Sequence, residues 1–198
     1  MSDNLAQAGA YIVQVLTGLY TFTVMLRFLM QVARADYYNP ICQSIVRITD
    51  PAIRPLRRAL PTIGAVDFAT LVVAFVVQLI GVMLIMGIYG NPFFHPIYLA
   101  WVSIGLFAII FQIYFYALII MVIASWIAPY STHPALTLVN QITEPLCAPA
   151  RKLLPPMGGL DFSIILVFMF IYIVKDILVI APIAHNYLRV PGGLIFGL

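Results

Sequence analysis

The chain carries the same polar segment twice, 94 residues apart. Residues 49–61 read TDPAIRPLRRALP, and residues 143–155 read TEPLCAPARKLLP. The alignment runs without a gap from residue 39 to residue 68, and 11 of these 30 positions are identical. Self-similarity at a fixed spacing is the signature of a duplicated structural unit. Because long apolar runs flank each copy, the repeat predicts one architecture built twice.

The distribution of charge excludes a water-soluble protein. Of the 198 residues, 63% are hydrophobic and 9% are charged, against about 25% charged in soluble domains. No Lys, Arg, Asp or Glu occurs over the 76 residues from Phe68 to Thr143. Such a stretch predicts an integral membrane protein.

Four apolar segments are long enough to cross the hydrocarbon core, which takes about 20 helical residues. In lipid every backbone polar group must pair within its own segment, so we expect helices and an all-α membrane protein. The spans cover approximately residues 8–30, 68–90, 98–128 and 162–184. The first repeat is then residues 1–95 and the second residues 96–198. With two spans each, the copies enter the membrane in the same direction, as parallel tandem repeats of helix-loop-helix.

Basic residues set the expected orientation. Five arginines lie between the first two spans, and Arg151 and Lys152 lie between the last two. The opposite side carries Arg189 alone. The positive-inside rule therefore predicts cytoplasmic loops and both termini outside. Residues 1–26 contain no Lys or Arg, so we expect the first apolar run to be a retained span and not a secretory signal.

Each loop has the pattern of short amphipathic helices at the membrane surface. Asn39-Pro40 is typical of an N-cap followed by proline at the first helical position. We expect this helix to end at Pro51 and a second short helix to begin near Pro55. Basic residues beside anionic lipid contribute about 1 kcal/mol each. The predicted lipid or partner interface comprises Arg54, Arg57, Arg58, Arg151 and Lys152. The alternative is a solvated loop whose arginines only fix topology.

The other repeated positions form a structural motif. Asp67 and Asp161 directly precede apolar runs, where an aspartate caps a helix and meets its positive end for about 1 kcal/mol. The alternative for these two residues is an ion or proton ligand at the inner mouth of a pathway. The motif comprises Asp50, Pro51, Pro55, Pro61, Gly64 and Asp67, then Glu144, Pro145, Pro149, Pro155, Gly158 and Asp161.

Arg27 is an ionisable residue near the inner end of the first span. A charge at the centre of a span costs about 2.5–3.5 kcal/mol, so such residues are functional candidates. Two interpretations stay open. Arg27 either extends to the headgroups or pairs with Asp67 or Asp161.

Lys175 and Asp176 lie about 20 Å along the fourth span, past the midplane. Adjacent residues diverge by about 100° on a helix, so the two cannot pair with each other on one face. We expect Tyr172 to donate to Asp176 and Lys175 to extend outward. A transport or partner-binding role is the alternative to this locally satisfied pair.

The motif TDPxxxPxRRxLP with Gly64 and Asp67-Phe68, and its second copy TEPxxxPxRKxLPPxGGxDFS, resembles the YggT family of bacterial membrane proteins. That family is related to plastid YlmG-type proteins. The resemblance covers nearly the whole chain. It implies a multi-pass protein of the bacterial inner membrane with a loose link to tolerance of osmotic or envelope stress. In plastid relatives it implies a link to cofactor attachment on a membrane cytochrome. It transfers no catalytic residues.

No hydrolytic, haem-attachment or zinc pattern occurs in the sequence, and Cys42 and Cys147 are expected to be buried or lipid-facing thiols. We therefore expect a non-enzymatic protein without cofactor or metal, which supports envelope or osmotic-stress tolerance. Its expected partners are anionic lipid of the phospholipid bilayer or a membrane protein, and no nucleic acid. The alternatives are a membrane cofactor-assembly factor and a small channel or transporter component. Four spans enclose little space, so a pore would require an oligomer.

Overall fold

The computed structural model of the protein describes residues 2–128, 131–154 and 161–195. Its first elements are α1 (Ser2–Val32), α2 (Pro40–Leu56), β1 (Thr62–Ile63), β2 (Val66–Asp67), α3 (Phe68–Ile88), α4 (Ile97–Ile127), α5 (Pro134–Leu153) and α6 (Ser163–Tyr172). The last helix continues as a π-helical segment η1 (Ile173–Leu178), then α7 (Ile180–Pro182) and a π-helical segment η2 (Ile183–Tyr187). Pro155 and Gly158 of the repeated motif lie outside the described residues.

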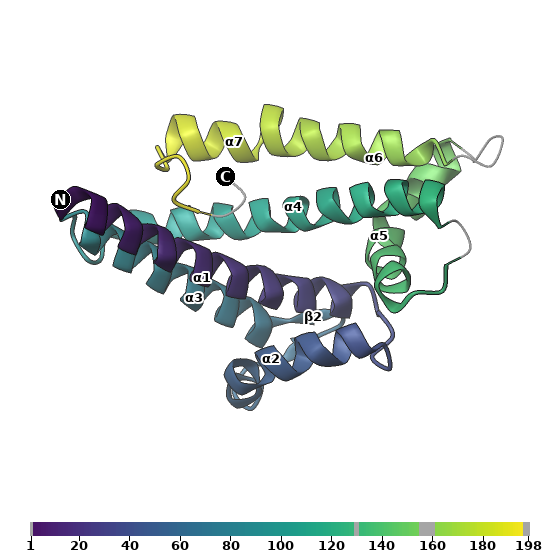
Figure 1. Cartoon of the computed structure of the whole chain (residues 1–198), viewed down its shortest axis with the longest axis horizontal. Coiled ribbons are helices and arrows are strands. Elements are labelled where there is room, and N and C mark those ends of the chain that lie inside the picture. Colours follow the sequence, from purple (N-terminus) through teal and green to yellow (C-terminus); the bar gives the residue numbers. More distant parts are fainter. Residues whose placement is uncertain (1, 129–130, 155–160, 196–198) are drawn as a thin grey trace.

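The predicted all-α membrane fold is confirmed. Within the described residues, four helices are long and apolar enough to cross a membrane: Asn4–Val32, Phe68–Ile88, Ile97–Ile127 and Ser163–Tyr187. Figure 1 shows them as two hairpins, α1 with α3 and α4 with the helix of α6 and α7. The N-terminus and α7 lie toward one end of the molecule, which we call the terminal end. The other end carries α2, the β-strands and α5, and we call it the loop end.

Each loop contains one continuous helix, so the expected break at Pro51 and restart near Pro55 are wrong. Proline has no N–H to donate and usually ends a helix, yet α2 continues through Pro51 and Pro55, and α5 through Pro145 and Pro149. In each helix the prolines stand four residues apart and are exposed. The carbonyl groups that lose their partners therefore lie on one outward face, where solvent or headgroups can satisfy them.

Both loop helices begin where the sequence favours a cap. The Asn39 side-chain oxygen accepts a hydrogen bond from the N–H of Ile41 at 2.9 Å. In the second copy His133 Nδ1 accepts from the N–H of Ala135 at 3.2 Å. Histidine thus replaces asparagine in the second repeat and performs the same capping function.

A small β-hairpin, which the apolar pattern does not reveal, connects α2 to α3. Its strands are antiparallel, with Thr62 opposite Asp67 and Ile63 opposite Val66. Gly64 in the turn has a φ of 62°, the left-handed region that favours glycine. The hairpin reverses the chain and sets Asp67 at the first turn of α3. Strands of two residues are too short to show a period-2 pattern.

The first hairpin is closed by a tight contact between its two helices. Gly81 of α3 faces Thr17 of α1, and a Cβ at position 81 would stand 2.6 Å from the threonine hydroxyl oxygen. Small residues allow such close approach between helices in lipid, where dispersion contacts drive association. The pair α1 and α3 therefore forms a compact unit.

The C-terminal segment packs against α4 at the terminal end. Trp101 of α4 donates its indole N–H to the carbonyl of Leu188 at 2.8 Å. Val190, Leu194 and Ile195 are buried, and Ile195 lies directly against Gly105. This segment fills part of the space between the hairpins.

Replacing Gly81 with alanine should force α1 and α3 apart, because the new methyl group meets Thr17. We expect a destabilisation of about 1–3 kcal/mol, the usual cost of overpacking, measured as a lower thermal unfolding midpoint in detergent. Gly9→Ala is the matched control, since nothing lies within 4 Å of its Cβ position. Equal midpoints for both variants would contradict the close contact.

Candidate functional site

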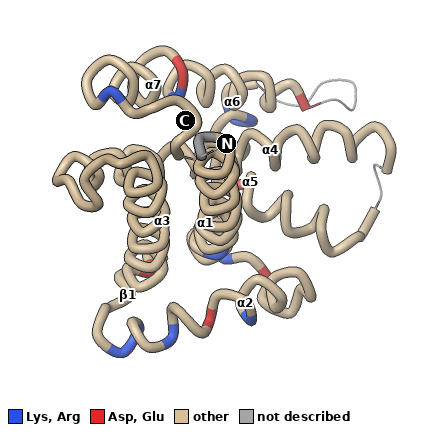
Figure 2. The backbone as a smooth tube through the Cα atoms, turned by 60° about the vertical axis from the view of Figure 1, so that its left-hand side comes forward, with Lys and Arg blue, Asp and Glu red and all other residues tan. Residues whose placement is uncertain are grey.

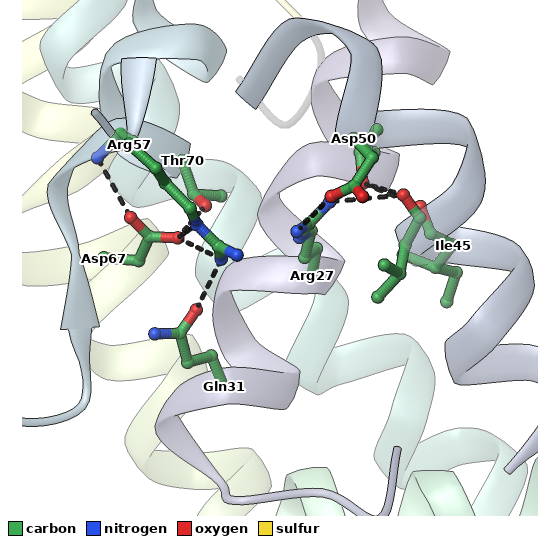
Figure 3. A network of polar contacts seen from close by, with 10 residues as sticks. Arg27, Gln31, Ile45, Asp50, Arg57, Asp67 and Thr70 are labelled. Atoms are coloured by element: carbon green, nitrogen blue, oxygen red, sulfur yellow. Dashed lines mark hydrogen bonds and ion pairs between the residues drawn. The ribbon is translucent and has the colours of Figure 1, made fainter. Parts of the chain in front are cut away.

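An arginine of the first loop pairs with the aspartate that begins the second span. Arg57 Nε donates to Asp67 Oδ2 at 2.8 Å, and Nη2 contacts the same oxygen. Asp67 is fully buried. Its other oxygen accepts from the N–H of Ala69 at 3.1 Å, and the Thr70 hydroxyl donates to Oδ2 at 2.8 Å (Figure 3). One carboxylate thus caps α3 and holds the preceding loop.

The second repeat preserves this arrangement. Arg151 Nε donates to Asp161 Oδ2 at 2.8 Å, again over a separation of ten residues. Asp161 Oδ1 accepts from the N–H of Ser163 at 3.0 Å and also contacts its hydroxyl. Arg151 Nη1 pairs in addition with Glu144 at 2.7 Å. We call the pairs Arg57–Asp67 and Arg151–Asp161 the Arg–Asp clamps.

The clamps favour the charged form of both aspartates. Burial acts to raise the pKa of Asp67, but hydrogen bonds from Arg57 and Thr70 outweigh it, and the pKa lies below its usual value. Burial acts on Asp161 in the same way and is outweighed by hydrogen bonds from Ser163 and Arg151, so its pKa is also lowered. With their oxygens engaged, these carboxylates serve as caps and ion-pair partners, which disfavours the alternative of an ion or proton ligand.

Arg27 is buried against α2 and does not extend to the headgroups. It is 2% exposed. Its Nη1 donates to the Thr49 hydroxyl at 2.7 Å and to the Val46 carbonyl at 3.2 Å. Its Nη2 pairs with Asp50 Oδ1 at 2.8 Å (Figure 3). The guanidinium therefore fixes α2 onto α1.

The expected pairing of Arg27 with Asp67 or Asp161 is wrong. Asp67 is already held by Arg57, and the continuous helix α2 carries Asp50 to the face that meets α1. The sequence pattern predicts that Asp50 lies at the end of a helix, and it does not indicate Asp50 as the partner of Arg27.

The second repeat replaces this ionic contact with a weak hydrogen bond from the Thr143 hydroxyl to a methionine sulfur. Met121 stands at the position equivalent to Arg27, and its sulfur lies 3.6 Å from the Thr143 hydroxyl. Glu144, the counterpart of Asp50, is consequently free to pair with Arg151. The two loops are therefore attached to their spans by different chemistry at equivalent positions.

Two arginines of α2 and one from the turn that follows it form an exposed basic groove. Arg47, Arg54 and Arg58 line a surface depression of about 620 Å³ together with Asp50, Pro51 and Pro55. Within the described part of the chain, no ion pair joins these three guanidinium groups to an acidic residue. Figure 2 shows charged residues concentrated on α2, while the spans beside it are almost free of charge. We call this depression the basic groove.

The second loop does not repeat the arginines of this groove. Gln141 and Ala148 replace Arg47 and Arg54, and Lys152 replaces Arg58. Of the predicted interface residues, Arg54, Arg58 and Lys152 are exposed, whereas the clamps engage Arg57 and Arg151.

Arg47 was missed as an interface residue because it precedes the expected helix end at Pro51. The signal was available, since Arg47 and Arg54 are seven residues apart and share one face of a continuous helix, and Arg58 follows in the next turn.

The charged residues of the fourth span are arranged differently from expectation. Lys175 Nζ donates to Gln112 Oε1 of α4 at 2.6 Å and does not extend outward. The predicted hydrogen bond from Tyr172 to Asp176 is absent among the described contacts, and both side chains are exposed. The π-helical segment η1 changes the angular spacing of these residues, so the α-helical i, i+4 argument does not hold there.

Comparison with known proteins identifies the family to which this repeated architecture belongs. The CCB3/YggT family model matches residues 6–88 and again residues 100–182. The chain belongs to the CCB3/YggT family. The double match confirms the internal repeat, and the resemblance seen in the sequence is also confirmed. No solved structure matches the chain.

Bacterial relatives resemble the chain over most of its length. An uncharacterised protein of Pseudomonas aeruginosa is 47% identical over 184 residues, which cover 91% of this chain and 92% of the relative. A Vibrio alginolyticus protein is 36% identical over 162 residues, covering 81% and 87%. The YggT protein of Escherichia coli is 36% identical over 160 residues, covering 79% and 81%.

Breaking a clamp should destabilise the fold. Arg57→Gln leaves the buried Asp67 carboxylate without its cation, and we expect a loss of about 1–3 kcal/mol. The range is kept low because the Arg57 side chain is 38% exposed and water screens part of the pair. A double-mutant cycle measures the coupling free energy between the two side chains. It compares the unfolding midpoints of Arg57→Gln, Asp67→Asn and the double variant with that of the wild type. Arg58→Gln, an exposed neighbour outside the clamp, is the control, and zero coupling would refute the clamp.

The clamps should also make stability fall at acid pH. Both aspartates have a lowered pKa in the folded state, so the stability they contribute is present above the unfolded value near 4. It is lost as the pH falls through the folded pKa. The difference in unfolding midpoint between the wild type and the double variant Asp67→Asn/Asp161→Asn should therefore be constant from about pH 7 to 5. It should shrink toward zero below about pH 4. A gap that does not depend on pH would contradict this.

Proposed function

We propose that the chain is a non-enzymatic protein of the bacterial inner membrane whose basic groove binds the phosphate groups of anionic phospholipids. In this proposal the loop end is cytoplasmic and both termini are periplasmic. The observation that carries it is the division of the loop arginines. Arg57 and Arg151 are used in the clamps, while Arg47, Arg54 and Arg58 stay exposed and line one depression, on α2 and the turn after it.

The helix that carries the groove is held firmly in place, which favours a binding role. Cys42, Ile45 and Ile53 are buried on the face of α2 opposite the groove. Arg27 fixes the same helix to α1. The three arginines are therefore presented in a fixed arrangement by a rigid element. A guanidinium fork matches phosphate oxygens in a bidentate geometry, and a rigid arrangement lowers the entropy cost of binding.

The position of the groove beside the ends of two spans supports a contact with lipid headgroups. The apolar span α3 begins at Phe68, and α2 packs beside the loop ends of α1 and α3 (Figure 1). The inner leaflet of bacterial membranes attracts basic residues near its surface, with about 1 kcal/mol for each Lys or Arg. Three arginines together then supply about 3 kcal/mol, enough for selective retention of anionic lipid.

A lipid-bound loop helix has a mechanical consequence that connects the site to envelope stress. Changes in bilayer thickness make spans tilt or shift, at a modest free-energy cost per ångström. Attachment of α2 to headgroups would keep the inner ends of α1 and α3 at a constant depth during such changes. We therefore propose support of the envelope under osmotic stress as the cellular role.

Replacing Arg47, Arg54 and Arg58 with glutamine should reduce anionic lipid retained on the full-length protein by about 10- to 100-fold, since up to three interactions of about 1 kcal/mol are removed. The measurement is native mass spectrometry after extraction from nanodiscs that contain phosphatidylglycerol and phosphatidylethanolamine. Arg189→Gln, an exposed arginine at the terminal end, is the charge-matched control. The triple lysine variant should show intermediate binding. Unchanged retention in the triple glutamine variant would refute the proposal.

The same variants test the cellular role. A strain that lacks the chain should recover slowly from an osmotic shift, and the wild type and Arg189→Gln should restore growth where the triple glutamine variant does not. Normal growth of the deletion strain, combined with loss of a membrane cytochrome complex, would instead favour the assembly-factor alternative.

A further inference from the structure

The fourth span is the least covered of the four. In an 18-residue apolar stretch of this span, only 22% is buried inside the molecule, against 33–39% in the corresponding stretches of the other spans. The positions equivalent to Lys175 and Asp176 in the first repeat are Gly81 and Val82, and both pack against neighbouring helices. At these positions the first hairpin has small or apolar residues packed against other helices, whereas the second hairpin has charged residues, of which Asp176 is exposed.

Asp176 is a carboxyl group exposed within the hydrocarbon region. It lies 13 residues beyond Ser163, at which α6 begins, and the span continues to Tyr187. At about 1.5 Å per residue this depth is about 20 Å from the loop end. In the described part of the chain its side chain accepts no hydrogen bond, and it is exposed. A polar group facing acyl chains is costly whether ionised or not, so a partner must cover it.

Apolar side chains on the same face continue the surface. Ile165, Met169 and Tyr172 are exposed by 61%, 53% and 58%, and Asp176 and Val179 extend the series. Ile165, Met169 and Tyr172 lie in α6, where spacings of four and three residues place them on one face, and Asp176 and Val179 are exposed farther along the same span. We call these five residues the fourth-span seam.

We propose that a second copy of this chain covers the fourth-span seam, with Lys175 of each copy pairing with Asp176 of the other. The two residues are adjacent, so they diverge around the helix and cannot neutralise each other within one chain. A twofold axis along the membrane normal brings the two fourth spans together in parallel. Each lysine then meets the aspartate of the other copy at nearly the same depth.

Charge complementarity is the reason for choosing a second copy as the occupant. An isologous contact requires a surface that is complementary to itself, and neighbouring opposite charges on one helix satisfy this requirement. Lys175 has the capacity for the contact, because its ammonium group has three hydrogens and the described contacts use one, toward Gln112. The pairing does not depend on the basic groove, which lies at the loop end.

Charge reversal tests the pairing in the full-length protein. Two differently tagged copies are expressed together, extracted in mild detergent, captured by one tag and quantified by the other. Lys175→Asp alone and Asp176→Lys alone each bring like charges together, so we expect the co-captured fraction to fall about tenfold or more in each case. Co-expression of the Lys175→Asp chain with the Asp176→Lys chain should restore it, because every carboxylate again meets an ammonium.

A second measurement reports the geometry directly and does not rely on charge variants. Tyr172→Cys should form an intermolecular disulfide in membranes after mild oxidation. Ile12→Cys, equally exposed on α1 at 58%, should not. Cys42 and Cys147 are buried, so the unsubstituted chain provides the blank.

The outcomes separate clearly. Wild-type copies that do not co-capture, or a mixed pair no better than either reversal alone, would overturn the proposal. So would equal crosslinking at positions 172 and 12, or capture of a different membrane protein in place of the second copy. Retention of phosphatidylglycerol measured on the same variants keeps this result separate from the lipid-binding proposal.

Discussion

The Arg–Asp clamp at the start of the second helix of each hairpin is the interaction on which the loop end depends. A span that begins with free backbone N–H groups needs an acceptor, and a buried aspartate supplies it. The buried charge then needs a cation, which Arg57 and Arg151 provide from the end of the preceding loop helix. The cap and the ion pair together fix where the chain leaves the loop and enters the next span. The other loop residues can then vary.

Variation between the copies shows how one scaffold acquires two kinds of surface. Arg27 anchors the first loop by an ion pair, and in the second loop Met121 accepts a weak hydrogen bond from Thr143. The arginines of the basic groove are not repeated in the second loop, and the first repeat has Gly81 and Val82 in place of Lys175 and Asp176. The repeated residues thus maintain the fold, whereas the residues that differ carry the proposed lipid and self-association surfaces. Duplication separated structural from functional constraints.

Much of the local structure was predictable because its causes are close in sequence. Asn39 and Asp67 could be identified as caps from the residues that follow them. The errors came from rules that tertiary contacts overrode. Pro51 predicts a helix end, but residues buried on both sides of it keep α2 continuous, and α5 likewise continues through its prolines. The partner of Arg27 was sought at similar depth, and the continuous helix supplied Asp50 instead.

The sequence by itself determined the membrane location of the fold, its helical class, the number of spans and the duplication. Hydrocarbon permits only segments that satisfy their own backbone, and segment length and polarity express this directly. Only the tertiary structure decided which charges pair. Lys175 meets Gln112 across 63 residues of chain, and the β-hairpin brings Asp67 back to Arg57. Such choices depend on helix continuity, rotation and approach, which no local pattern encodes.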